Sequence, residues 1–106
     1  MDDQELQLTA KKEGRALSIA LSGEVNTATA PQLKNILDAE LPESDEVTFD
    51  FQHCDFVSSA GLRILLATFK TLRARKGKMK LTNIGPNFRE VLNITGLDAV
   101  FGCKQR

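Results

Sequence analysis

Histidine and cysteine are scarce in this chain of 106 residues, which has one histidine, His53, and two cysteines, Cys54 and Cys103. A structural zinc ion needs about four clustered ligands, so the sequence predicts no metal site. The cysteines lie far apart and form no C-x-x-C pair. In a reducing cytosol they are predicted to be buried, small apolar side chains rather than a disulfide.

The chain also lacks a long apolar run and a basic, apolar leader. No stretch approaches the roughly 18 apolar residues of a membrane span. The segment Met1-Asp2-Asp3-Gln4-Glu5 is acidic, whereas a signal peptide begins with basic residues followed by an apolar stretch. We therefore expect a cytoplasmic protein that does not bind membranes.

An excess of one charge is missing as well, because 14 basic and 14 acidic residues cancel. A nucleic-acid-binding domain usually has a basic excess, so no nucleic-acid partner is expected. The basic residues do cluster along the chain, at Lys70, Arg73, Arg75, Lys76, Lys78 and Lys80. Cations gather near the C-terminus of a helix, and Gly77 is predicted to stop one. The cluster is therefore interpreted as a solvated helix end.

The common catalytic motifs are absent too. A nucleophile elbow requires G-x-S-x-G, but residues 57–61 are Val-Ser-Ser-Ala-Gly, without the first glycine. His53 is the only available imidazole base, and a packed or surface histidine explains it more simply. Neither glycine-rich phosphate-binding pattern is present. The sequence therefore predicts a protein that is not an enzyme and needs no cofactor.

The first part of the chain predicts an antiparallel hairpin within one domain that spans residues 1–106. Apolar residues alternate with polar ones at Leu6, Leu8 and Ala10, and again at Leu17, Ile19 and Leu21. Both patterns are typical of strands with one buried face. Glu13-Gly14 marks a tight turn between them, which implies antiparallel pairing. Residues 23–26 are predicted to leave the second strand as a loop.

The remainder predicts alternating helices and strands. A helix capped by Thr27 or Thr29, with Pro31 in its first turn, runs to Pro42. Strands are predicted at residues 47–51, 79–81 and 97–101, and further helices at 59–77 and 86–96. Such alternation implies parallel pairing with right-handed crossovers. The predicted fold class is α/β: a mixed sheet of four to five strands, packed with helices.

Two serines stand where a predicted strand passes into a predicted helix. The first N–H groups of a helix have no partner inside it, so a serine there often caps them. A phosphate at that point would meet the free N–H groups and the positive end of the helix dipole. Small Ala60 and Gly61 leave the hydroxyl accessible to an enzyme. From these residues alone, Ser58 and Ser59 fit either an ordinary cap or a phosphorylation site.

Three segments, in this order and spacing, resemble one known family. They are Gly23-Glu24-Val25-Asn26-Thr27-Ala28-Thr29-Ala30-Pro31-Gln32-Leu33, Phe56-Val57-Ser58-Ser59-Ala60-Gly61-Leu62 and Ile94-Thr95-Gly96-Leu97. The chain resembles the STAS domains, the sulphate-transporter and anti-sigma-factor-antagonist type, and in particular the bacterial anti-sigma factor antagonists. The resemblance extends from the first hairpin to Phe101.

The resemblance implies a function in transcription regulation. In the family, an unphosphorylated antagonist binds an anti-sigma factor, which is often also a serine kinase, and so releases a sigma factor. Phosphorylation by that kinase ends the contact, and a phosphatase can reset it. The family's acceptor serine corresponds to Ser59, which precedes Ala60, Gly61 and Leu62. We expect the protein to be a monomer or a weak dimer.

A partner-binding face follows from the same motifs. Loops after parallel strands leave one edge of the sheet, so Glu24, Asn26, Ser58 and Ser59 are expected to lie close together. Arg63, four residues after Ser59, would either pair with a phosphate there or contribute nothing. The predicted partner-binding residues are Glu24, Asn26, Thr27, Ser58, Ser59, Ala60, Gly61 and Arg63.

The chain departs from the family pattern in three ways. Ser58 stands where sporulation-type members have an acid, and Asn26 replaces an acid found in many members. The chain ends at Arg106 without the further helix common in the family, so some apolar surface is expected to be exposed. An alternative hypothesis is a STAS subunit of another assembly, such as a lipid-transport or stress-sensing complex, without a phosphorylation switch.

Overall fold

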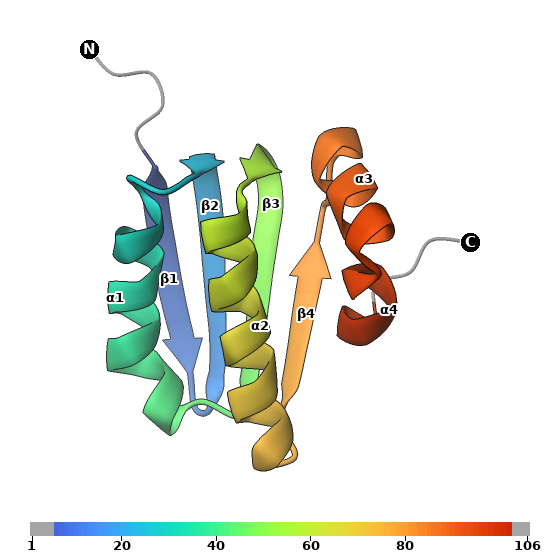
Figure 1. Cartoon of the computed structure of the whole chain (residues 1–106). Coiled ribbons are helices and arrows are strands. Elements are labelled where there is room, and N and C mark those ends of the chain that lie inside the picture. Colours follow the sequence, from blue (N-terminus) through green and yellow to red (C-terminus); the bar gives the residue numbers. More distant parts are fainter. Residues whose placement is uncertain (1–5, 103–106) are drawn as a thin grey trace.

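The computed structural model describes residues 6–102 and contains a mixed sheet (Figure 1). The strands are β1 (Gln7–Glu13), β2 (Ala16–Val25), β3 (Glu46–Val57) and β4 (Lys78–Thr82), in the order β1-β2-β3-β4. β1 and β2 are antiparallel, whereas β2–β3 and β3–β4 are parallel. This confirms the predicted α/β class and the antiparallel hairpin, whose turn contains Gly14 with φ 62°.

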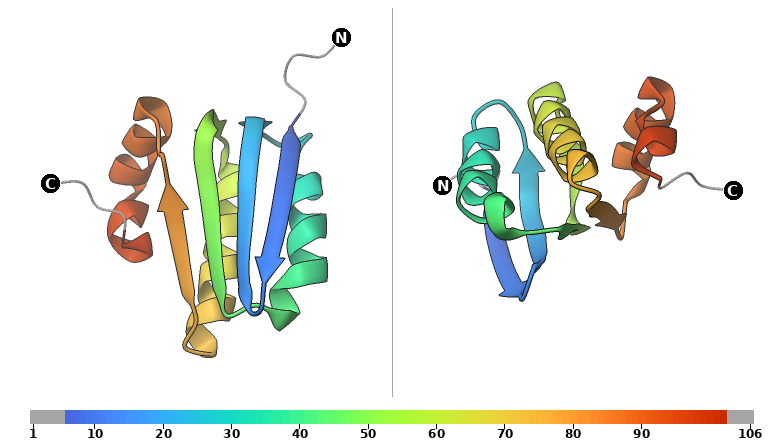
Figure 2. Two further views of the ribbon diagram at one scale, coloured as in Figure 1. Left: turned by 180° about the vertical axis from the view of Figure 1, so that it is seen from behind. Right: turned by 90° about the horizontal axis from the view of Figure 1, so that it is seen from below.

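Helices cover one face of the sheet. They are α1 (Ala30–Glu40), a short 3-10 turn (Leu41–Glu43), α2 (Ser59–Ala74), α3 (Pro86–Thr95) and α4 (Leu97–Phe101). α1 and α2 lie over one face of the sheet and run along the strands, and α3 and α4 lie beside β4 (Figures 1 and 2). Seen from behind, the other face of the sheet has no helix over it in the described part of the chain (Figure 2). Among residues 6–102, no helix is long and apolar enough to cross a membrane.

The predicted strand at residues 97–101 is wrong, because these residues form α4. Gly96 ends α3 with φ 78°, and the chain then turns into a second short helix. Leu97 and Phe101 are four residues apart and share a helical face, and the Phe101 ring packs 5.6 Å from that of Phe69. The last described element is therefore a helix, whereas a strand was expected. Apolar side chains are nevertheless exposed on these helices, at Ile94 (75%) and Val100 (44%).

β2 is longer than predicted, because Gly23, Glu24 and Val25 belong to the strand rather than to a loop. The pairing of β2 with β3 shifts register between Ala20 and Glu24, and Gly23 has φ 118°. These irregularities interrupt the alternation by which a strand is recognised in sequence. The extension carries β2 to the same level as the end of β3.

The core lies between the sheet and its helices. Phe49, Phe51 and Phe88 are fully buried, and the rings of Phe51 and Phe88 lie 4.7 Å apart. Cys54 is buried as predicted, and this burial raises the pKa of its thiol. Cys103 lies outside the described residues.

The basic residues between Lys70 and Lys80 have different roles, because some form structural hydrogen bonds and others are exposed to solvent. Helix α2 ends at Ala74 rather than at Gly77, and Lys76 adopts φ 62°. The Arg75 guanidinium donates hydrogen bonds to the carbonyl oxygens of Leu41 (3.2 Å), Pro42 (3.1 Å) and Ser44 (3.0 Å). Arg75 therefore fastens the end of α2 to the segment before β3, whereas Lys78 and Lys80 belong to β4.

Candidate functional site

The carboxyl ends of β2 and β3 lie side by side at one edge of the sheet. Glu24 pairs with Phe56 and Val25 with Val57. The Ser58 N–H then donates to the Val25 carbonyl oxygen at 2.8 Å. The structure thus brings Glu24 and Asn26 next to Ser58 and Ser59. We call this part of the molecule, residues 24–29 and 55–61, the loop edge.

Of the four other predicted residues, Thr27, Ala60 and Gly61 lie within the loop edge and Arg63 lies just beyond it. Thr27 is exposed in the turn between β2 and α1. Arg63 is exposed one turn into α2 and makes no ion pair among residues 6–102.

The start of α1 is closed by side chains of the loop edge. The Asn26 side-chain oxygen accepts hydrogen bonds from the N–H groups of Ala28 (2.9 Å) and Thr29 (3.0 Å). The Thr29 hydroxyl accepts from the Asn26 N–H at 2.9 Å and donates to the Glu24 carbonyl oxygen at 2.7 Å. Thr29, one of the two predicted cap residues, occupies the N-cap position but makes no side-chain cap bond. The first N–H groups of the helix are met by backbone carbonyl oxygens, that of Asn26 for Ala30 and that of Thr29 for Gln32.

Asp55 closes the start of α3 in a similar way. Its carboxylate accepts from the N–H groups of Asn87 (3.3 Å) and Phe88 (3.1 Å), and from the Asn87 side-chain amide (3.0 Å). A side chain on Gly85 would collide with this carboxylate. Sequence reasoning missed Asp55, because the contact joins residues more than 30 positions apart and leaves no local pattern.

The start of α2 is the open one among these three helix starts. Ser58 occupies its N-cap position but forms no cap bond, and its hydroxyl oxygen is buried without a hydrogen-bond partner among residues 6–102. The first helical hydrogen bond runs from the Leu62 N–H to the Ser58 carbonyl oxygen at 2.9 Å. Within the described chain, no acceptor meets the N–H groups of Ser59, Ala60 and Gly61.

This opening has a definite electrostatic character. The N-terminus of a helix carries about half a positive charge, and the first turn of α2 contains no acidic residue to offset it. Ser59, the first residue of α2, is exposed. A phosphate on its hydroxyl would add negative charge beside unpaired N–H groups, which is a favourable arrangement.

Gly61 fixes how closely α2 begins against the sheet. A Cβ atom at this position would lie 2.6 Å from Val25 Cγ1 and 2.7 Å from Val57 Cγ1. From the sequence, this small residue was expected to give access to the serine. The structure shows another role, since glycine here allows the first turn of α2 to touch both strands.

Two substitutions of Asn26 should distinguish the effect of its hydrogen bonds on stability from the effect of the negative charge that many family members have at this position. We expect Asn26→Ala to lower the free energy of unfolding by about 1 kcal/mol, because two N–H groups lose their acceptor. Asn26→Asp keeps the acceptor oxygen and adds a charge favoured at a helix start, so its stability should equal or exceed that of the wild type. Urea unfolding of all three proteins measures this, and an unchanged stability of Asn26→Ala would contradict the capping contact.

The fold and the loop edge define an α/β domain that presents an exposed serine at an open helix start. Among the described residues, no three histidine, cysteine, aspartate or glutamate side chains gather into a possible metal site. The chain belongs to the STAS domain family, whose model matches residues 7–106.

Relatives within this family support the resemblance noted in the sequence. The chain is 37% identical over 97 residues to BtrV of Bordetella bronchiseptica, covering 91% of this chain and 84% of BtrV. An anti-sigma factor antagonist from Mycobacterium paratuberculosis superimposes with a TM-score of 0.80 at 26% identity, covering 94% of this chain and 86% of that one. Phosphorylated SpoIIAA, a Bacillus cell fate determinant, shares the fold with a TM-score of 0.73 at 21% identity, covering 88% and 86%.

Proposed function

We propose that this protein is an anti-sigma factor antagonist controlled by phosphorylation of Ser59. In the unphosphorylated state it binds, through the loop edge, an anti-sigma factor that is also a serine kinase. This contact frees a sigma factor for transcription. Phosphorylation of Ser59 ends the contact, and a phosphatase restores it. The protein acts in the cytoplasm as a binding protein and catalyses no reaction.

The observation that carries this proposal is the difference between the three helix starts. At α1 the backbone carbonyl oxygens of Asn26 and Thr29 accept the first helical N–H groups, and at α3 the Asp55 carboxylate accepts them. At α2, Ser58 makes no bond to these groups within the described chain, and the neighbouring Ser59 is exposed. An ordinary N-cap serine would satisfy these groups itself, so the arrangement suits an added anion better than a simple cap.

The two serines also differ in access. The Ser58 hydroxyl is buried, whereas Ser59 is exposed. A kinase must bring the acceptor oxygen into line with the transferred phosphoryl group, which a buried hydroxyl prevents. The names of the relatives support the same function, since the M. paratuberculosis protein is an anti-sigma factor antagonist and SpoIIAA has been solved in a phosphorylated form.

Mapping the phosphorylation site tests this proposal. Incubation with ATP and a candidate serine kinase from the same genome should place one phosphate on Ser59, as measured by mass spectrometry of peptides. Ser59→Ala should abolish the modification, and Ser58→Ala, the matched control, should retain it. Phosphate on Ser58, or on neither serine with every such kinase, would contradict the proposal.

A further inference from the structure

A second surface lies away from the loop edge, on the last strand of the sheet. β4 pairs with β3 on one side and is the final strand in the sheet order. Within the described residues, its other side has no neighbouring strand. An edge strand of this kind presents unpaired N–H and C=O groups, which another extended chain can bond.

Basic residues predominate in the segment that contains β4, although the whole chain is neutral and β3 places Glu46 beside Lys78. Between Asp55 and Glu90 the sequence contains no acidic residue. The basic residues in that interval are Arg63, Lys70, Arg73, Arg75, Lys76, Lys78, Lys80 and Arg89. Lys76, Lys78 and Lys80 are exposed and form no ion pair among residues 6–102. These three lysines without an ion pair therefore favour an acidic partner at this edge.

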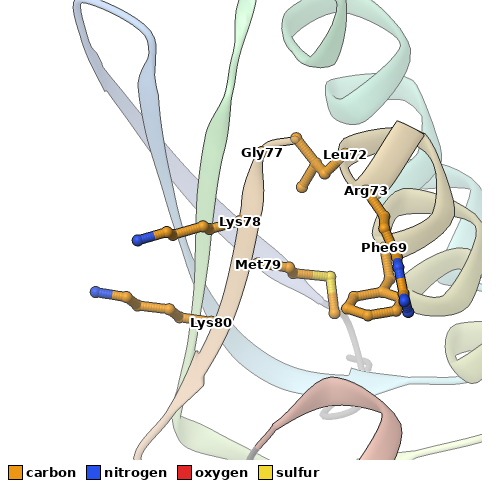
Figure 3. Close-up of a pocket in the computed structure, with 7 residues that line it drawn as sticks. All are labelled: Phe69, Leu72, Arg73, Gly77, Lys78, Met79 and Lys80. Atoms are coloured by element: carbon orange, nitrogen blue, oxygen red, sulfur yellow. The ribbon is translucent and has the colours of Figure 1, made fainter. Parts of the chain in front are cut away.

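An apolar groove adjoins the same strand on the side of the helices. It has a volume of about 410 Å³ and is lined by Phe69, Leu72, Arg73, Gly77, Lys78, Met79 and Lys80 (Figure 3). In the close-up, Met79 points towards the Phe69 ring, and the side chains of Lys78 and Lys80 extend to the opposite side of the strand (Figure 3). The Arg73 guanidinium lies 5.9 Å from the centre of the Phe69 ring.

We propose that the free edge of β4 binds an extended protein segment in which acidic and apolar residues alternate. Successive side chains of a strand point to opposite faces. In a segment paired with β4, one set of side chains enters the groove beside Phe69 and Met79, and the other set meets Lys78 and Lys80. The acidic side chains of the ligand thus lie on the same face as Lys78 and Lys80, and its apolar side chains lie on the same face as Met79.

Two physical features favour this occupant over others. Lysines on an edge strand repel basic chains and hinder neutral strands from stacking, so they select an acidic segment. Met79 and Leu72 are recessed in a groove and buried, whereas a protein that inserts into a membrane surface presents protruding apolar side chains. A peptide strand fits a recessed groove better than a lipid surface does.

A fluorescent peptide of alternating valine and glutamate, with blocked ends, is the probe. We expect it to bind the full chain, and its affinity to fall as salt is raised. Lys78→Glu/Lys80→Glu should weaken binding at least about tenfold, because like charges then face one another. Lys11→Glu, which changes a lysine on the other edge strand, is a control with half that change of charge and should leave the affinity within about twofold. Circular dichroism confirms that each variant is folded.

Two further measurements test where the peptide binds and whether binding requires alternating residues. Hydrogen exchange should slow at the amides of Met79 and Leu81, which face away from β3, when the valine–glutamate peptide binds. A peptide of the same composition with its glutamates in one block should bind at least about tenfold more weakly, since it cannot place apolar and acidic side chains on opposite faces. Equal affinity for both peptides, no loss in the double variant, or binding only of anionic phospholipid vesicles would overturn the proposal. Because no step uses Ser59, failure here leaves the proposed function untouched.

Discussion

Phosphorylation of Ser59 is expected to weaken binding of the cognate anti-sigma kinase by about 10- to 100-fold, without altering the fold. The phosphate adds roughly −1.5 to −2 charges at neutral pH. Within the protein this charge is well tolerated, because the N–H groups of Ser59, Ala60 and Gly61 are free to meet it. A partner surface packed over the loop edge would instead have to remove the phosphate from water. An ion desolvated without a matched partner costs several kcal/mol.

Three variants distinguish the effect of a phosphate on Ser59 on kinase affinity from a general effect of added negative charge. Ser59→Ala should bind with wild-type affinity and never switch off, whereas Ser59→Asp should reproduce part of the loss. Ser18 is also exposed, on the helix-free side of β2, so Ser18→Asp adds the same charge elsewhere and should bind normally. Calorimetric titration with the kinase measures all of them. Equal affinities for Ser59→Ala, Ser59→Asp and phosphorylated protein would show that Ser59 is only a helix residue, and would favour a STAS subunit without a switch.

The parts of the fold that sequence predicts are those with regular local patterns. Alternation at Leu17, Ile19 and Leu21 identified β2, and the spacing of apolar residues after Ser59 identified α2. The pattern failed where geometry is irregular. Register shifts hid the end of β2, and residues 97–101 were too few to distinguish a helical turn from a strand.

The candidate site was predicted less completely than the fold. The sequence placed two serines at a helix start, which the structure contains. It gave no sign that Ser58 would leave its hydroxyl without a partner, or that Asp55 would occupy the start of α3. Both facts depend on rotamers and on contacts between distant segments. Local sequence therefore identifies where an anion could sit, and tertiary structure decides which helix start remains open.

Substitution of Gly61 should destabilise the protein at the loop edge. We expect Gly61→Ala to lower the free energy of unfolding by about 2 kcal/mol, because the new methyl group would overlap Val25 and Val57. Both valines are buried, and their branched side chains have few alternative rotamers. Alanine favours helix by up to about 1 kcal/mol over glycine, which offsets only part of this overlap. The midpoint of thermal unfolding should fall by roughly 8–16 °C.

A double-mutant cycle distinguishes this overlap from other effects of the substitution. Val25→Ala alone should destabilise the protein, because it leaves a cavity in the core. In the Gly61→Ala background the same change removes one of the overlapping methyl groups, so the double variant should be more stable than the sum of the single losses predicts, by at least about 0.5 kcal/mol. Thermal and urea unfolding of the four proteins measure the coupling. Strict additivity would show that α2 does not begin in contact with β2, and the close placement of Ser59 beside Glu24 and Asn26 would lose its structural basis.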